Sequence, residues 1–178
     1  MRRGEPWWQT QPQYLRLVAG SAPVPSAQDH GMTHDPTPGA VRAFFVYGTL
    51  MQGESNHPVV ARHGLVSVQP GSIRGVLYDT GQGYPAMRRS QGDQRVQGEV
   101  IVPRDLEAAT QSMDALEGYA GPGDPGNLYE REQVEVTLDA DGSTCTAWVY
   151  VYARELSEQT RIASGSWRQW RGAGRASR

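Results

Sequence analysis

The sequence predicts an α+β fold in which a mixed, barrel-like β-sheet is flanked by short helices. Several runs alternate apolar and polar residues, as Val134, Val136 and Leu138 do, which is typical of a sheet with one buried face. Only two segments have helical character, and no strand–helix–strand unit repeats along the 178 residues. These observations favour a barrel-like sheet over a doubly wound parallel sheet.

The first half of the predicted domain is mostly strand. In chain order, the expected elements are a buried strand at 43–46, a short helix at 57–64, strands at 64–70 and 71–79, and a turn-rich loop at 81–86. Gly48 ends the first strand and Gly64 ends the helix, because glycine adopts the backbone conformations that turns require.

The second half contains one longer helix among strands. In chain order, the expected elements are a strand at 96–102, a helix at about 104–117, and strands at 129–138 and 143–153 joined by a hairpin turn at 139–142. Pro103 is expected to open the helix, since the missing N–H of proline costs nothing in the first helical turn.

The two ends of the chain differ from this domain, which is predicted to span residues 41–172. Residues 1–40 contain six prolines and have neither helical nor strand periodicity, so they are expected to be disordered or loosely attached. Met32 lies just before the domain and is an alternative start. Residues 173–178 are expected to form a flexible C-terminal tail.

Composition excludes several classes of function. The net charge of −2 gives no general attraction to nucleic acid or membrane surfaces. All 17 basic residues are arginine, which excludes a lysine Schiff base and a Walker-type phosphate loop. This usage also indicates the codon bias of a GC-rich, bacterial genome. Cys145 is the only cysteine, which excludes an internal disulfide and a cysteine-based metal cluster.

The sequence also leads to expectations about the location of the protein in the cell, its oligomeric state and its bound groups. No apolar run approaches the ~20 residues of a membrane span, and the polar N-terminal stretch is unlike a signal peptide. A cytoplasmic protein is therefore expected, as a monomer or a weak homodimer. His57 and His63 lack the spacing of zinc ligands, and neither a glycine-rich dinucleotide fingerprint nor an EF-hand loop occurs, so no metal site and no cofactor are expected.

Glu117 is the strongest candidate for a catalytic residue. Leu106, Ala109, Met113 and Leu116 form the apolar face of the expected helix, and Glu117 borders that face. Burial there raises the pKa of a carboxyl group toward neutrality, which makes it a usable general base. The alternative is a surface glutamate at a helix end, although a carboxylate is unfavourable beside the negative end of the helix dipole.

Other segments are expected to complete the site. Tyr47-Gly48-Thr49-Leu50 follows a strand, and a glycine turn lets backbone N–H groups converge on an anion such as a carboxylate. The segment Tyr84-Pro85-Ala86 and the strand-opening Tyr129 are expected to line the same cavity. For each of these, the alternative is an ordinary turn or a packed side chain.

Three further polar side chains are secondary candidates. Asp114, three residues before Glu117, is expected to be a capping or orienting group and not a second acid. Tyr150 and Tyr152 share one face of a strand, and one of them is expected to reach the site.

Seven short motifs occur in order along the predicted domain. They are FVYGTL (45–50), GVLYD (75–79), GYPA (83–86), VQGEV (96–100), MDALEGY (113–119), LYER (128–131) and AWVY (147–150). Together they resemble the gamma-glutamylcyclotransferase-like superfamily, in particular its AIG2-like, gamma-glutamylamine cyclotransferase branch. The resemblance covers about residues 41–172.

The resemblance implies a barrel-like fold with one cavity. It implies that the loop at 47–50 holds the α-carboxylate of a γ-glutamyl substrate, that Glu117 is the catalytic acid/base, and that Tyr129 contacts the substrate. The substrate's α-amine would attack its own γ-carbonyl and release 5-oxoproline, with neither metal nor cofactor. A glycine-rich insertion at 120–126 is expected to cover or widen the cavity.

Two other functions are the alternatives. A non-catalytic small-molecule binding protein would use the same cavity without turnover. The loop at 47–50 together with Glu117 favours the enzyme, because a binding protein has no need of the base. A scaffold role for residues 1–40 ranks last, since that segment carries no recognisable ligand motif.

Overall fold

The computed structural model describes residues 41–156 and 160–176. Side chains are described as far as Ala173. The predicted N-terminal tail, residues 1–40, lies outside the described residues, and so do residues 177–178.

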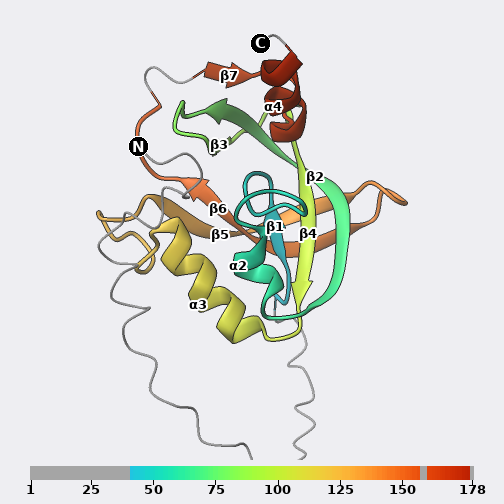
Figure 1. Ribbon diagram of the computed structural model, residues 1–178, viewed down its shortest axis with the longest axis vertical. Helices are drawn as coiled ribbons and strands as arrows, with labels where there is room; N and C mark the ends of the chain where they lie inside the picture. Colours follow the sequence, from blue (N-terminus) through green and yellow to red (C-terminus); the bar gives the residue numbers. More distant parts are fainter. Residues whose placement is uncertain (1–40, 157–159, 177–178) are drawn as a thin grey trace, which may run out of the picture. The chain divides into compact units, whose positions relative to one another are not determined.

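Strands dominate the described part of the chain (Figure 1). In chain order, its elements are β1 (Phe44–Val46), α2 (His57–Ala61), β2 (Leu65–Asp79), β3 (Pro85–Arg89), β4 (Arg95–Pro103), α3 (Leu106–Glu117), β5 (Tyr129–Leu138), β6 (Thr144–Tyr152), β7 (Thr160–Ile162) and α4 (Trp167–Ala176).

Five of the strands close into a barrel. Their order is β2–β4–β1–β6–β5, and β5 returns to β2 through pairs at Gly71 and Ser72. All pairings are antiparallel except the one between β1 and β6. The far half of β2 leaves the barrel and pairs with β3 and β7. The predicted α+β fold with a mixed, barrel-like sheet is confirmed.

Apolar side chains on neighbouring strands build the core. Phe44 on β1, Ile101 on β4 and Val136 on β5 are fully buried. On β5, Val134 and Val136 are buried whereas Glu135 between them is exposed. The predicted period of two is therefore confirmed on that strand. Helices α2 and α3 contact each other, and Figure 1 shows them near the same end of the barrel.

The prediction of two separate strands at 64–70 and 71–79 is wrong. Residues Leu65–Asp79 form one continuous strand with a bulge near its start. Pro70 and Gly71 are typical of a turn, yet here they pair in register with Glu99 and Gly98 of β4. The exposed Pro70 still uses its carbonyl oxygen, which accepts a hydrogen bond from the N–H of Asp139. One long strand can therefore serve both the barrel and the sheet beside it.

Helix α3 begins later than predicted. Pro103 is the last residue of β4 and pairs with Leu65, so it does not open the helix. The N-cap is Asp105, whose carboxylate accepts a hydrogen bond from the N–H of Ala108 at 3.0 Å. An aspartate in this position satisfies one of the free N–H groups of the first turn.

Three elements were not predicted. β3 includes Pro85 and Ala86, which were expected in a loop, and β7 and α4 follow the last expected strand. The expected domain boundary at residue 172 falls inside α4. This helix is anchored at its start by Trp167, which is fully buried.

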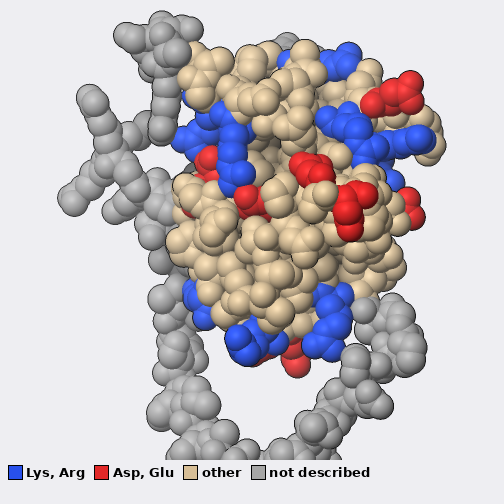
Figure 2. All heavy atoms as spheres, turned by 90° about the vertical axis from the view of Figure 1, so that its right-hand side faces the viewer, with Lys and Arg blue, Asp and Glu red and all other residues tan. Residues whose placement is uncertain are grey.

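The surface carries charges of both signs. On the face shown in Figure 2, arginine and acidic side chains are intermixed and form no extended patch of one sign. In the described ranges, no helix is both long enough and apolar enough to cross a membrane.

Candidate active site

The end of α3 places Glu117. Ala109, Met113 and Leu116 are buried against the strands, which fixes the rotation of the helix about its axis. Gly118 ends the helix with a φ of 63°, and its N–H donates to the carbonyl oxygen of Asp114. Glycine adopts this left-handed conformation without steric cost. Glu117 is therefore held on the last turn, with part of its surface still accessible.

The carboxyl group of Glu117 lies in an environment unusual for a glutamate. It has no hydrogen-bond partner among the described residues. Burial, followed by the nearby negative charge of Asp114, raises its pKa to about 8. A carboxyl group with this pKa can both accept and donate a proton near neutral pH. The raised pKa expected from the sequence is therefore present.

The loop at 47–50 directs its carbonyl groups into the protein. Those of Gly48, Thr49 and Leu50 accept hydrogen bonds from the N–H of Met51 (3.1 Å), the N–H of Asn56 (2.8 Å) and Nδ1 of His57 (3.0 Å). In contrast, the N–H groups of Gly48, Thr49 and Leu50 meet no acceptor within the described part of the chain. Such a turn offers several N–H donors to an anion.

Close contacts connect this loop to the segment at 84–86. A Cβ atom on Gly48 would lie 2.6 Å from Cγ of Pro85, so the backbone of the loop touches the proline ring. The carbonyl oxygen of Pro85 accepts a hydrogen bond from the hydroxyl of Tyr129 at 2.8 Å. The structure thus brings together three segments that the sequence assigned to one cavity.

Four tyrosines interact electrostatically with Glu117. Its charge acts on the hydroxyl groups of Tyr47, Tyr84, Tyr129 and Tyr150, and contributes to raising the pKa of each. Burial is the largest cause in all four cases, and it is the main reason that the pKa of Tyr84 reaches about 12. The phenols therefore stay neutral at the pH values at which Glu117 titrates.

The hydroxyl of Tyr129 makes a hydrogen bond within the protein, and its contact with a substrate stays a prediction. Its side chain is buried, and its hydroxyl hydrogen is already donated to Pro85. The same hydrogen cannot also be donated to a substrate oxygen. Tyr129 therefore supports Pro85, and through it the loop at Gly48.

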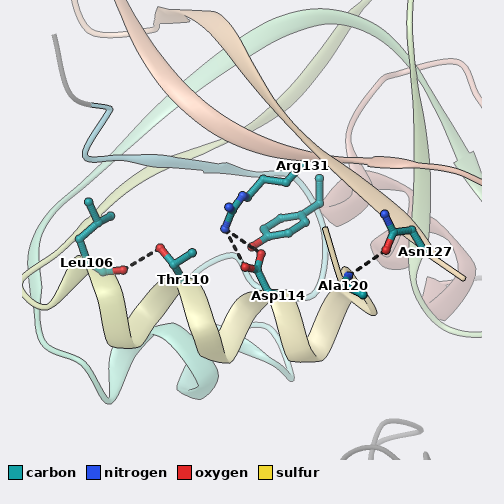
Figure 3. A network of polar contacts seen from close by, with 7 residues as sticks. Leu106, Thr110, Asp114, Ala120, Asn127 and Arg131 are labelled. Carbon is teal, nitrogen blue, oxygen red and sulfur yellow. Dashed lines mark hydrogen bonds and ion pairs between the residues drawn. The ribbon is translucent and has the colours of Figure 1, made fainter. Parts of the chain in front are cut away.

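The insertion at 120–126 is tied down through Asn127, which is 2% exposed. The side-chain oxygen of Asn127 accepts from the N–H of Ala120 at 2.8 Å, as Figure 3 shows. Its side-chain nitrogen donates to the carbonyl oxygen of Gly121 at 2.7 Å and to Glu130 at 2.8 Å. Whether this segment covers a cavity stays a prediction. Asn127, which follows the segment, holds its first residues close to the end of α3.

A buried glutamate holds the chain just after the loop at 47–50. Glu99 is 6% exposed and accepts hydrogen bonds from the N–H of Gln52 at 2.7 Å and from Arg168 of α4 at 2.8 Å. Arg168 also donates to the carbonyl oxygen of Gln52 at 2.5 Å. Sequence reasoning missed this support because its partners are 47 and 69 residues apart.

Asp114 is not a helix cap. Its carboxylate accepts hydrogen bonds from Arg131 at 2.7 and 2.9 Å and from the hydroxyl of Tyr150 at 2.6 Å (Figure 3). The expectation of an orienting group fits this arrangement better than that of a cap. Arg131 was not among the predicted site residues, although its position two residues after Tyr129 puts both on one face of β5.

Replacement of Gly48 by alanine should weaken substrate binding. The new methyl group would lie 2.6 Å from the rigid ring of Pro85, so the loop would have to shift. We expect KM to rise about tenfold, equivalent to about 1.4 kcal/mol. The free energy of unfolding should fall by about 1–3 kcal/mol.

Steady-state kinetics and urea denaturation measure these two effects. Gly172→Ala is the control, because a Cβ atom at Gly172 meets nothing within 4 Å. Wild-type KM in Gly48→Ala would contradict the role of this loop in binding.

The sequence also matches a known family model. The family described as "Gamma-glutamyl cyclotransferase, AIG2-like" matches residues 44–169. The chain belongs to this family. Among its relatives, the gamma-L-glutamyl-butirosin B gamma-glutamyl cyclotransferase of Niallia circulans is 40% identical over 127 residues, which are 71% of this chain and 76% of the relative. The resemblance found in the sequence motifs is confirmed, and the protein is a cyclotransferase-family enzyme.

Solved structures have the same fold as this cyclotransferase. YkqA from Bacillus subtilis gives a TM-score of 0.57 at 22% identity, and the match covers 76% of this chain and 42% of YkqA. An AIG2-like protein from Mus musculus gives a TM-score of 0.53 at 23% identity, with 66% of this chain and 80% of that chain covered. At these identities the likeness shows the fold alone.

Proposed function

We propose that this enzyme releases 5-oxoproline from a small γ-glutamyl amine or peptide, with Glu117 as general base and then general acid. The observation that carries the proposal is the carboxyl group of Glu117, which is held at the Gly118-capped end of α3 and whose pKa is raised by burial to about 8. A carboxyl group that served only as a surface charge would keep a pKa near 4.5.

The reaction requires two proton transfers at one place. The ionised carboxylate of Glu117 takes a proton from the α-ammonium group of the substrate. The free α-amine attacks the γ-carbonyl carbon, and a five-membered ring closes. The bond from the γ-carbon to the departing nitrogen then breaks as Glu117 gives the proton to that nitrogen. The ring nitrogen loses its second proton through Glu117 to the released amine, which leaves as an ammonium ion. One carboxyl group suffices for both transfers because the attacking and departing nitrogens are bonded to the same carbon.

The substrate itself helps to ionise Glu117. In the free enzyme at neutral pH, a carboxyl group with a pKa near 8 is mostly protonated. A substrate ammonium group beside it favours the charged form, since opposite charges a few ångströms apart lower the pKa of an acid. Binding would thus prepare the base, and some turnover persists below pH 8.

The loop at 47–50 would orient the substrate. The N–H groups of Gly48, Thr49 and Leu50 suit the α-carboxylate, because an anion is stabilised by several converging N–H donors. A γ-glutamyl chain held at its α-carboxylate has its amine and its γ-carbonyl in the same molecule. Correct orientation then contributes several kcal/mol toward ring closure.

The departing amine is the part of the substrate that remains to be identified. The name of the Niallia circulans relative specifies a γ-glutamyl group on butirosin B. We include amines of that kind among the candidates, together with γ-glutamyl dipeptides and ε-(γ-glutamyl)-lysine. All share the γ-glutamyl group that the loop and Glu117 would recognise.

Release of 5-oxoproline from such a panel, measured by mass spectrometry, tests the proposal. We expect release from at least one member, and the member with the highest kcat/KM identifies the class of departing amine. If no member reacts although γ-glutamyl compounds bind, the enzyme does not act on this group as proposed.

A further inference from the structure

Tyr150 connects the two halves of the proposed site. Its backbone carbonyl oxygen accepts a hydrogen bond from the hydroxyl of Tyr47 at 2.7 Å, at the start of the loop. Its own hydroxyl donates to Asp114 at 2.6 Å, one turn before Glu117 on α3. Tyr150 is 3% exposed and its bond from Tyr47 is buried, whereas its bond to Asp114 is partly buried. A single residue of β6 thus contacts both the loop and the helix that carries the base.

Arg131 of β5 holds the same stretch of chain from another side. Its Nη1 atom contacts both carboxylate oxygens of Asp114 at 2.7 and 2.9 Å. Its guanidinium carbon lies 5.0 Å from the ring centre of Tyr119 and 5.1 Å from that of Trp148. Asp114 lies three residues before Glu117 and Tyr119 two residues after it. The chain is therefore held on both sides of Glu117 by one planar, permanently charged group.

We propose that Tyr150, Asp114 and Arg131 form a positioning network that sets the place and the charge state of the Glu117 carboxyl group relative to the loop at 47–50. The inference rests on the proposed cyclotransferase function. These residues act through Glu117. Intramolecular attack is sensitive to orientation, and a displacement of about 1 Å can reduce a rate about 100-fold.

The network also supplies the fixed charges near Glu117. The groups coupled electrostatically to it are Asp114 from its own helix and the hydroxyls of Tyr47, Tyr84, Tyr129 and Tyr150, and Arg131 is paired with Asp114. The phenols remain neutral, so Asp114 and Arg131 carry the charge. Asp114 raises the pKa of Glu117, and Arg131 favours the charged form of Asp114 by lowering the pKa of that carboxyl group. Removal of the Asp114 charge should therefore lower the pKa of Glu117.

Two conservative variants test the network. Asp114→Asn removes the charge and keeps the shape. For this variant, we expect the ascending limb of the pH profile of kcat/KM to lie about one pH unit lower than that of the wild type. Tyr150→Phe keeps the ring and the backbone carbonyl but removes the bond to Asp114. For this variant we expect kcat to fall about tenfold while KM changes less than about twofold, because the base loses orientation.

Asp105→Asn is the matched control. It removes one negative charge from the start of the same helix, and asparagine caps a helix as well as aspartate does. It should keep the wild-type pH profile. Thermal denaturation checks each variant for folding. If Asp114→Asn does not fold, the kcat and KM of Tyr150→Phe alone decide whether the positioning network exists.

A carboxyl ¹³C NMR titration separates this inference from the proposed function. The Glu117 resonance is identified by its loss in Glu117→Gln, and no substrate is needed. A lower pKa of Glu117 in Asp114→Asn supports the network even if no γ-glutamyl compound reacts. An unchanged Glu117 pKa in Asp114→Asn, together with wild-type kcat in Tyr150→Phe, would overturn the inference while leaving the cyclotransferase activity intact.

Discussion

Glu117→Gln should reduce kcat for 5-oxoproline release at least about 1,000-fold. General acid–base catalysis typically contributes 10²–10⁴-fold, and here one residue would carry both proton transfers. Glutamine has nearly the same shape, and it occupies a position where the carboxyl group has no hydrogen-bond partner among the described residues. The fold should therefore survive the change. Mass spectrometry of 5-oxoproline over time measures the loss.

The matching control lies on the same helix. Glu107→Gln makes the identical change at an exposed position in the first turn of α3 and should keep wild-type turnover. Calorimetric binding of a slowly reacting γ-glutamyl compound should show that Glu117→Gln still binds, with a modest loss of affinity, because the loop at 47–50 is untouched and only the attraction of the carboxylate for the substrate ammonium group is removed. Turnover by Glu117→Gln within tenfold of the wild type would remove this residue from the mechanism.

Local signals in the sequence indicate the residues of the proposed site. Glu117 borders the apolar face of α3, and this position is half-buried whichever way the helix packs. The turn at Gly48 is visible because a buried strand ends there. The hairpin between β5 and β6 and the alternation of Val134 and Val136 likewise depend on neighbours in the chain. Features of this kind need no knowledge of the tertiary structure.

Partners that lie far apart in the sequence could not be predicted from local signals. Asp114 pairs with Arg131 and Tyr150, which are 17 and 36 residues away. No local rule distinguishes these partners from other polar residues of β5 and β6. The course of β2 through Pro70 shows the same limit, since pairing with β4 overrides a dipeptide that usually turns the chain. The sequence thus predicts the candidate base, and the tertiary structure supplies the groups that set its position and pKa.

The same base should make the folded protein less stable as pH rises. In the unfolded chain Glu117 has an ordinary pKa near 4.5, whereas in the folded protein the value is about 8. Between these pH values the folded state keeps a proton that the unfolded state has lost. The free energy of unfolding therefore falls with increasing pH across this window, by about 1.4 kcal/mol per unit. The stabilisation is fully present below pH 4.5 and is lost as pH approaches 8.

Comparison with Glu117→Gln isolates this effect. Glutamine cannot ionise, so the variant should match the wild type near pH 5 and exceed its free energy of unfolding by on the order of 3 kcal/mol near pH 8. Urea denaturation at pH 5, 6.5 and 8 measures the difference, and titration of other groups such as Asp114 and His63 largely cancels between the two proteins. A difference that does not change with pH would mean that Glu117 titrates normally. A growing difference would mean that the half-buried carboxyl group destabilises the fold at the pH where its charged form is needed for proton transfer.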